Sequence, residues 1–507
     1  MRAAALLRLA LAGTRTDTAR VLLTGLSAAL AALAALAALT VLAIPEPVGD
    51  PYAQAEQYGN ALLREPGLRG GTAFALLLLV IPVLALAAQC ARLGAPARDR
   101  RLAALRLAGA TPGQVTRLAM LETGVASLLG TLGGLGLYLG ARVLLDRPDD
   151  RGRLAFPTDV LPWPGPLAAV VLGLPLVAAL ATALMLRRVT TSPLGVTRRA
   201  ARERGPGPWA GVVIASGLVA FAAGGRVLLS YDGSSEATVW LLGVLYVGGG
   251  LAAMVGVVLG AGWISHTTGR LLHRYARRPA ALLAAGRLMA DPWAGSRTFA
   301  ALLAAVIFGA GAAVLRAYFA LQDQLAREQN RLSGVDAGGN PFYLATMDLV
   351  DLAIAVAVAI AAAGLLVAVV EGIVARRRAY AALVATGVPR ATIARSIVWQ
   401  STLPAVPAIL TALAVGTFLG RALFGDVSRS VTSTEICDAS AELCADPVTR
   451  QQYTRIVYGP EVRRTADVPL EHLALLGAGA LAAVLLTVAV GLLFLRASTA
   501  VEELRTT

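Results

Sequence analysis

The stretch RRLAALRLAGATPGQVTRLAMLE, from Arg100 to Glu122, recurs in altered form as RAYAALVATGVPRATIARSIVWQ, from Arg378 to Gln400. At this spacing of 278 residues, arginines, a leucine and a glycine fall at matched positions, as do the neighbouring apolar segments. The matched pairs are Arg100 and Arg378, Ala104 and Ala382, Leu105 and Leu383, Gly109 and Gly387, and Arg117 and Arg395. Chance rarely aligns charges, glycines and segment ends together, so we predict an internal duplication.

Each copy is predicted to form two helices joined by a tight turn, a bend that we call an elbow. In the first elbow (about 92–119), the pattern indicates a basic amphipathic helix with Leu102 and Leu105 on one face. Gly109 is placed to end that helix in a left-handed cap.

A helix-start signal follows the glycine of the first elbow. Thr111 is the expected N-cap and Pro112 takes the first helical position. Gln114, three residues after the cap, completes a capping box. The second helix is therefore expected to run from here into the membrane.

The second elbow (about 371–396) keeps the turn residues Gly387 and Pro389, but Val388 offers no capping side chain. We expect this copy to be the less rigid one. Both elbows could be ordinary juxtamembrane loops whose arginines only set membrane orientation. The same order of arginine, glycine and proline in two places instead favours a pair of docking elements for a cytosolic partner.

The composition predicts an integral membrane protein. Hydrophobic residues make up 57% of the 507 residues, charged residues only 15%, and the mean hydropathy is +0.67. All 45 basic residues are arginine, so the chain lacks the lysine of a P-loop ATPase. Its three Cys and three His lack metal-ligand spacing. We therefore expect no catalytic, cofactor or metal site in this chain.

Apolar runs long enough to cross a bilayer as helices predict an all-α protein with ten spans. The runs cover about 21–44, 71–91, 120–141, 165–186, 208–228, 239–263, 298–316, 350–370, 397–420 and 473–495. None has an ionisable side chain in its middle third. Since proton-coupled carriers place such groups at mid-membrane, an external energy source is indicated.

Arginine distribution predicts the orientation. With a cytoplasmic N-terminus, 29 of the 45 arginines fall on the inside segments 1–20, 92–119, 187–207, 264–297, 371–396 and 496–507. By the positive-inside rule, both termini are expected in the cytoplasm. The pI of about 10.5 then reflects topology and anionic lipid, and nucleic-acid binding is the weaker interpretation.

The N-terminal region has two interpretations. Arg2 and Arg8 before an alanine-rich stretch resemble a signal peptide. The apolar run from Val21 to Ile44 exceeds a signal-peptide core, however, and Arg20 lies at its inner edge. A retained membrane anchor is the expected form.

The duplication divides the chain into two four-span units. The predicted units are residues 1–204, with spans one to four, and 280–507, with spans seven to ten; residues 205–279 form two linking spans. The loops after the first span of each unit are short, about 45–70 and 317–349, so no large extracytoplasmic domain is expected.

The longest outer segment, about 421–472, contains Cys437 and Cys444. In an oxidising compartment these two could close a small disulfide ring, although two free thiols are the alternative. Side chains of the same segment could bind a ligand or only form a solvated surface: Tyr453, Tyr458, Arg463 and Arg464.

The chain resembles the FtsX-like permease family of ABC transporters, which includes MacB and the ten-span BceB-type permeases. The resemblance rests on the two elbows: basic residues, then Leu-x-x-x-Gly, a proline-containing turn, and a helix reaching Glu122 or Gln400. It extends over nearly the whole chain. The sequence lacks the large extracytoplasmic domain of MacB, which weakens a tripartite efflux role.

The resemblance implies a permease of the bacterial cytoplasmic membrane whose elbows carry coupling helices for a cytosolic ATP-binding subunit. ATP and Mg²⁺ would be bound by that partner, with two copies per chain. The implied coupling residues are Arg101, Leu105, Gly109, Thr111, Pro112, Arg378, Leu383, Gly387 and Pro389.

Three functions follow as hypotheses. The first is ATP-driven export or extraction of an amphipathic drug, peptide or lipid. The second is a non-transporting subunit that passes ATP-driven motion to an extracytoplasmic enzyme or a sensor kinase. The third is a secondary carrier, which should bind no ATPase.

Overall fold

The computed structural model describes residues 15–45, 54–90, 104, 107–190, 207–229, 236–332, 342–430, 433–438, 444, 453–458 and 461–498. In the first half the helices are α2 (Arg15–Leu42), α3 (Ala61–Arg64), α4 (Pro66–Cys90), α6 (Pro112–Leu145) and α7 (Pro164–Thr190). The linking region contains α8 (Trp209–Leu229), α9 (Glu236–Gly243), the π-helical turn η1 (Val244–Gly248) and α10 (Gly249–Tyr275).

The remaining elements belong to the second half of the chain. Its helices are α11 (Pro279–Ala290), α12 (Pro292–Leu332), α13 (Phe342–Ala375), α14 (Arg377–Ala385), α15 (Arg390–Phe424) and α18 (Leu470–Ser498). Four short strands lie between α15 and α18: β1 (Asp426–Ser430), β2 (Ser433–Cys437), β3 (Thr454–Tyr458) and β4 (Glu461–Thr465).

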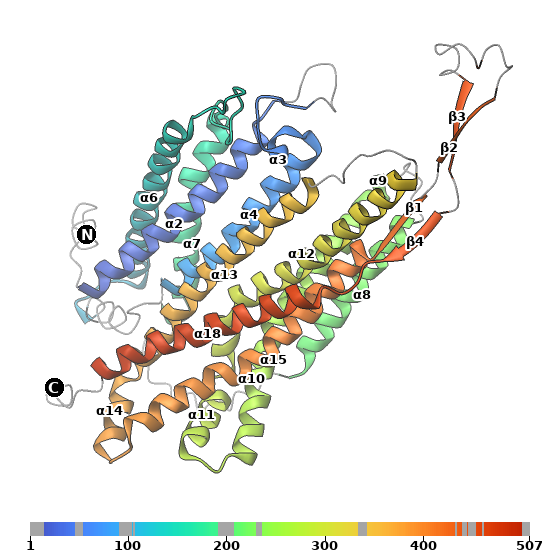
Figure 1. Cartoon of the computed structure of the whole chain (residues 1–507). Helices are drawn as coiled ribbons and strands as arrows, with labels where there is room; N and C mark the ends of the chain where they lie inside the picture. Colours follow the sequence, from blue (N-terminus) through green and yellow to red (C-terminus); the bar gives the residue numbers. More distant parts are fainter. Residues whose placement is uncertain are drawn as a thin grey trace.

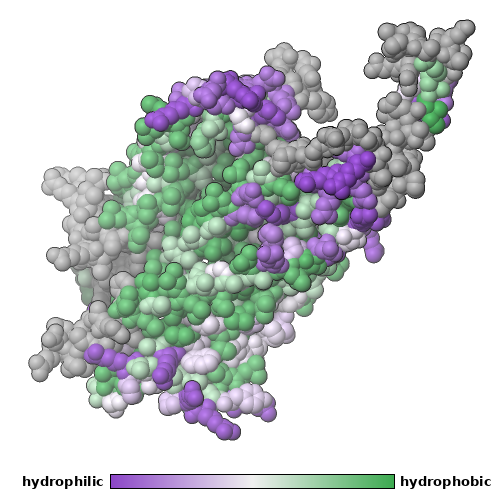
Figure 2. Space-filling view, in the orientation of Figure 1, coloured by the Kyte–Doolittle hydropathy of each residue, from purple (hydrophilic) through white to green (hydrophobic). Residues whose placement is uncertain are grey.

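The protein is a multi-pass membrane protein of α-helices. Nine helices among the described residues are long and apolar enough to span a bilayer, and they coincide with nine of the predicted spans. The second predicted span coincides with α4, 25 residues long. A hydrophobic band crosses the molecule between two hydrophilic ends (Figure 2), as a bilayer requires.

The two units share most of their helix contacts, although α13 also contacts α18 in the second unit. In the first, α2 contacts α4, α6 and α7, and α6 contacts α7. In the second, α12 contacts α13, α15 and α18, and α15 contacts α18. The units meet where α4 lies beside α13 (Figure 1), so the second span of each unit forms the shared interface.

The linking helices pack on the second unit. Both α8 and α10 contact α15, and α10 also contacts α12. They are therefore a lateral addition to one unit rather than a partition between the two.

Glycines on the third span of each unit permit close contact with the first span. A Cβ added at Gly130 would overlap the carbonyl oxygen of Gly25, and one added at Gly134 would lie 2.7 Å from that of Ala29. In the second unit a Cβ at Gly416 would overlap the carbonyl oxygen of Ile307. Both are small-xxx-small contacts, as expected between membrane helices.

Two predicted loops are partly regular. Helix α12 continues to Leu332, so the first half of the segment 317–349 is helical rather than irregular. The segment 421–472 contains two antiparallel ladders, β1 with β4 and β2 with β3. These strands project as a ribbon beyond the helices (Figure 1), a small β element that the all-α prediction missed.

Candidate functional site

The two elbows lie at the same end of the bundle, and the β-ribbon lies at the other (Figure 1). Arg101 and Leu105 fall outside the described residues. The other candidate coupling residues are placed: Gly109, Thr111, Pro112, Arg378, Leu383, Gly387 and Pro389.

The first elbow turns on Gly109 and a capping box. Gly109 has φ of 91°, a left-handed conformation that an L side chain adopts only with strain. The amide of Gln114 donates to Thr111 Oγ1 at 3.3 Å, and the amide of Thr111 donates to Gln114 Oε1 at 3.1 Å. Helix α6 therefore starts at a fixed angle to the preceding chain.

Leu107 of the first elbow is 92% exposed and lies next to the turn at the elbow end of the bundle. A leucine so fully exposed adds little to the stability of the chain, and its apolar area is free to be buried by a partner. Sequence reasoning chose Leu102 and Leu105 for the apolar face and missed Leu107. The sequence did contain a hint of this exposure. Leu107 does not belong to the predicted apolar face, and it lies two residues before the turn glycine Gly109.

The second elbow ends α14 in a Schellman motif. Gly387 has φ of 93°. Its amide donates to the carbonyl of Val384, and the amide of Val388 donates to that of Leu383, both at 3.0 Å. The two copies of the repeat thus place their glycines in the same left-handed conformation.

The N-cap of α15 is Pro389, with no side-chain hydrogen bond. An uncapped second copy was expected, but the cap was assigned one residue too early, to Val388. Val388 is instead partly buried with Leu383 and Val384 against a cluster that includes Ile373. Leu383 therefore packs inward and stabilises the elbow, whereas Arg378 and Pro389 are exposed.

A further contact joins the second elbow to α11, a helix that sequence analysis did not predict. Arg287 of α11 donates to the hydroxyl of Tyr380 on α14 at 2.7 Å, and its guanidinium lies 4.8 Å from the ring centroid. Burial of Arg287 lowers its pKa from the ordinary arginine value. Because α12 follows α11 directly, this contact ties α14 to the helix that leads into the first span of the second unit.

A cavity of about 170 Å³ lies directly behind this contact. Its polar lining includes Arg376, Asp291 and Gln400, and its apolar lining includes Phe299 and Leu365. The space lies where α10, α11, α12, α13 and α15 meet.

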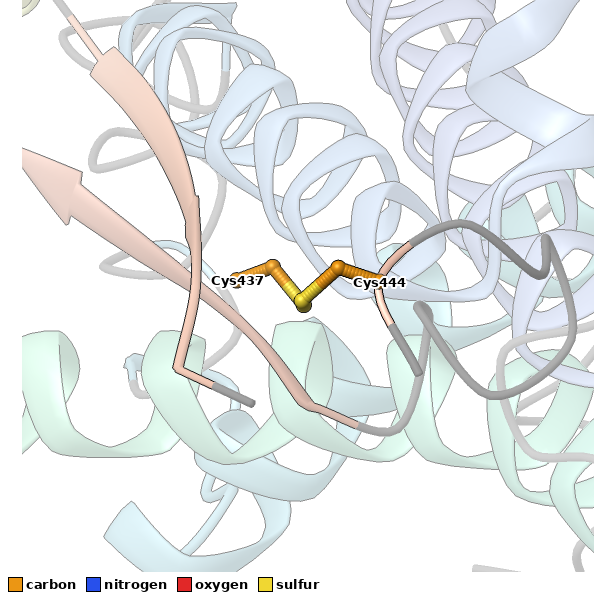
Figure 3. The surroundings of a disulfide bond; sticks show 2 residues. All are labelled: Cys437 and Cys444. Atoms are coloured by element: carbon orange, nitrogen blue, oxygen red, sulfur yellow. A yellow bond between two sulfur atoms is a disulfide. The ribbon is translucent and has the colours of Figure 1, made fainter. Parts of the chain in front are cut away.

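At the opposite end, the ribbon is closed by a disulfide between Cys437 and Cys444 (Figure 3). Close to the membrane, Arg463 of β4 pairs with Asp426 of β1 at 2.6 Å. The hydrogen bonds from Arg463 and Thr465 lower the pKa of Asp426. Covalent and ionic ties thus stiffen both halves of the ribbon.

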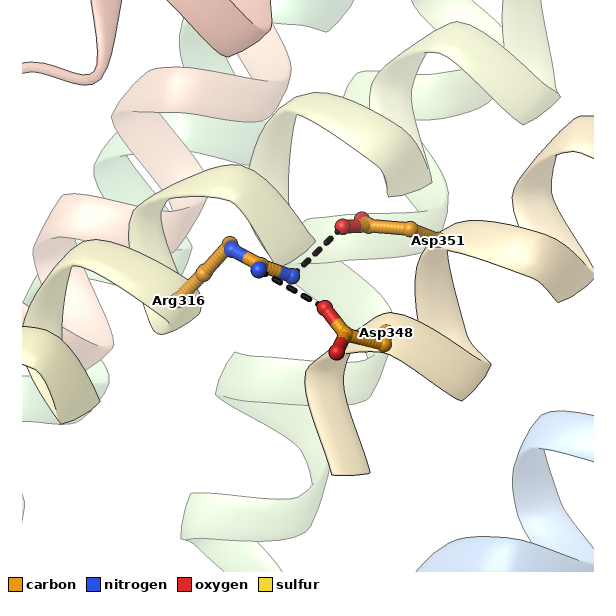
Figure 4. A network of polar contacts seen from close by, with 3 residues as sticks. All are labelled: Arg316, Asp348 and Asp351. Carbon is orange, nitrogen blue, oxygen red and sulfur yellow. Dashed lines mark hydrogen bonds and ion pairs between the residues drawn. The ribbon is translucent and has the colours of Figure 1, made fainter. Parts of the chain in front are cut away.

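An ion-pair network links α12 and α13 near the same end. Arg316 contacts Asp348 at 2.7 Å and Asp351 at 2.8 Å (Figure 4). The two carboxylates lie three residues apart on α13, so both face α12. The helical extension of α12 beyond Arg316 is therefore held to the start of α13.

The Thr111 cap gives a local prediction. Thr111→Ala should destabilise the first turn of α6 by about 1 kcal/mol, and hydrogen exchange at the Gln114 amide should quicken about fivefold. Thr111→Ser should keep the protection, because serine offers the same acceptor. If the Gln114 amide exchanged at the same rate in Thr111→Ala as in the wild type, Thr111 would have no capping role.

Among the described residues, no group of three or more His, Cys, Asp or Glu side chains could hold a metal ion. A family model described as the FtsX-like permease C-terminal domain matches the chain twice, over residues 72–194 and 352–502. Each match begins near the second span of a unit and includes one elbow. No curated protein and no solved structure matches the chain.

Proposed function

Because the chain belongs to the FtsX-like permease family, we propose that it couples ATP hydrolysis by a separate cytosolic subunit to the export or extraction of an amphipathic substrate. The family assigns an ABC transporter-type permease subunit, which generally works with an ATP-binding subunit. The finer proposal is that one chain recruits two ATPase copies, one at each elbow. ATP and Mg²⁺ would be held by those partners.

The observation that carries the proposal is the repeated elbow geometry. Gly109 and Gly387 have φ of 91° and 93°, and each lies just before a long helix, α6 or α15. Both elbows lie at one end of the bundle, so two copies of one ATPase could dock side by side. A duplicated docking geometry suits a dimeric motor.

The orientation follows from the arginine distribution. We place the elbow end in the cytoplasm of a bacterial cell, with both termini there and the β-ribbon outside. The units are residues 1–204 and 280–507, joined by the linking region 205–279.

Motion would pass from the motor to the spans through the second elbow. A push on α14 reaches α11 through the contact between Tyr380 and Arg287, and α13 and α15 through the buried side chains of Ile373 and Ile393. Dense packing transmits such a displacement with little loss. The interface between α4 and α13 is where the two units would move against each other.

The coupling residues have separate roles. Leu107, with Arg101 and Leu105, would contact the ATPase at the first elbow, and Arg378 at the second. Gly109, Thr111, Pro112, Gly387 and Pro389 would set the turn. Leu383 would hold the second elbow to its unit.

Reconstitution tests the proposal. The full chain should copurify with a cytosolic ABC ATP-binding subunit, and ATP should drive flux of an amphipathic dye across proteoliposomes. A secondary carrier would bring down no ATPase, and that result would refute the proposal.

One observation supports the second function, regulation of an extracytoplasmic enzyme or a sensor kinase. The stiffened ribbon extends beyond the helices (Figure 1) and is joined to α15 and α18, both part of the second unit. It could therefore carry motion outward to a protein. This function would be favoured by ATP turnover that occurs without substrate flux and that is lost when residues 433–458 are deleted.

A further inference from the structure

A groove between α15 and α18 lies near the end of the bundle opposite the elbows. It has a volume of about 790 Å³ and an almost entirely apolar lining. The residues on α15 are Leu413, Ala414, Thr417, Phe418, Arg421 and Ala422, and those on α18 are Leu470, Leu473 and Ala474.

The shape of the groove follows from where the two helices touch. At Gly477 an added Cβ would lie 3.0 Å from Leu413 Cδ1, so α15 and α18 approach closely there. Beyond this contact the helices leave an open space that extends to Arg421. Leu413 and Arg421 are eight residues apart, which is about 12 Å along a helix.

The groove faces the hydrocarbon region of the membrane. Phe418 is 44% exposed and Leu470 is 72% exposed, and both belong to membrane-spanning helices. Water is not stable in an apolar space open to lipid, so an acyl chain must fill it. A groove about 12 Å long spans most of the hydrocarbon depth of one leaflet, which is about 15 Å.

A cation lies at the end of the groove. Arg421 makes no hydrogen bond or ion pair among the described residues. The charge of Arg421 acts on Asp426, but that carboxylate is already paired with Arg463 and hydrogen-bonded to Thr465. Glu471 follows Leu470 on α18 but does not line the groove. The Arg421 guanidinium is thus available to an anion.

We propose that this groove binds an anionic phospholipid from the leaflet opposite the elbows, with an acyl chain in the groove and the phosphate on Arg421. A planar guanidinium suits a phosphate because it can donate two parallel hydrogen bonds. Thr417, one turn deeper on the same face of α15, supplies a hydroxyl near the headgroup. The site goes beyond the proposed function, because it requires neither the ATPase nor a transported substrate.

Lipid retention tests the proposal. The full chain is purified from vesicles of equal parts phosphatidylglycerol and phosphatidylcholine, and the lipids that remain bound are counted by mass spectrometry. We expect phosphatidylglycerol to be enriched on the wild-type chain. Arg421→Gln should reduce that enrichment about tenfold, since a hydrogen bond between charged groups is lost.

Matched variants separate the groove from the general lipid annulus. Arg147→Gln removes one exposed charge from the same end of the other unit and should leave retention unchanged. Ala474→Trp should fill the groove and displace the lipid, whereas Leu486→Trp, at a 66% exposed position of α18 outside the groove, should not.

Two outcomes would overturn the site. One is equal phosphatidylglycerol enrichment in the wild type and Arg421→Gln, which would mean annular lipid only. The other is unchanged lipid content in Ala474→Trp. Copurification of the ATPase, measured on the same samples, is expected to be unaffected in every variant. Its failure in the wild type would count against the proposed function and leave the lipid result intact.

Discussion

Leu107→Asp is expected to abolish copurification of the ATP-binding subunit while leaving membrane insertion unchanged. Leu107 is 92% exposed in the chain alone. Its burial against a partner would contribute about 1.5 to 3 kcal/mol to the interface. The aspartate would also place a carboxylate without a partner at the contact, which costs more. Association should therefore weaken by well over tenfold.

Controls distinguish docking from folding. Leu107→Met keeps an apolar side chain of similar volume and should retain the ATPase. Because Leu107 makes almost no contact within the chain, thermal stability of Leu107→Asp should match the wild type. ATPase binding at wild-type strength in Leu107→Asp would remove this side chain from the coupling surface.

Leu383→Asp in the second elbow is predicted to act differently from Leu107→Asp in the first. Leu383 is partly buried beside Val388 on the cluster under the second elbow. An aspartate there should therefore destabilise the elbow itself, and lower the thermal midpoint together with ATPase binding. If ATPase binding were lost while the thermal midpoint stayed at the wild-type value, Leu383 would instead belong to the docking surface.

Gly130→Ala is expected to disrupt the first unit. The added methyl group would overlap the carbonyl oxygen of Gly25, and the contact is between two backbones, so no side chain can move aside. The helices α2 and α6 would have to separate along the contact, at a cost of about 1 to 3 kcal/mol or more. The yield of monodisperse protein and its unfolding temperature should both fall.

Gly133→Ala is the matched control. Gly133 lies on the same helix and an added Cβ would meet no atom within 4 Å. Alanine there should be neutral or stabilise by up to about 1 kcal/mol through helix propensity. Equal unfolding temperatures for the two variants would show that the α2–α6 contact is looser than described.

Much of the fold could be predicted because the local composition of a chain is enough to identify its membrane helices. Nine of the ten apolar runs coincide with candidate spanning helices, since a bilayer forces any such run to satisfy its own backbone hydrogen bonds. Irregular outer segments were harder to predict. The strands β1 and β4 pair across more than 30 residues of chain, and such pairing leaves no local signal when the strands are five residues long.

The candidate site was predicted in part for the same reason. The turn residues Gly109, Thr111 and Gly387 act within a few positions of themselves, so their sequence context predicts their conformation. The direction of Leu383, the exposure of Leu107 and the contact of Arg287 with Tyr380 depend on neighbours from other helices. No local pattern contains that information.

The sequence by itself determined that the chain spans a membrane many times, that it is built from a duplicated unit, and that each copy contains a helix–turn–helix elbow. These properties depend on hydrophobic length, charge count and capping, which act between residues close together in the chain. Only the tertiary structure decided that α4 and α13 join the units, that α8 and α10 attach to the second one, and that a groove ends at Arg421. Those features depend on which helix faces meet, and packing across long sequence separations fixes that choice.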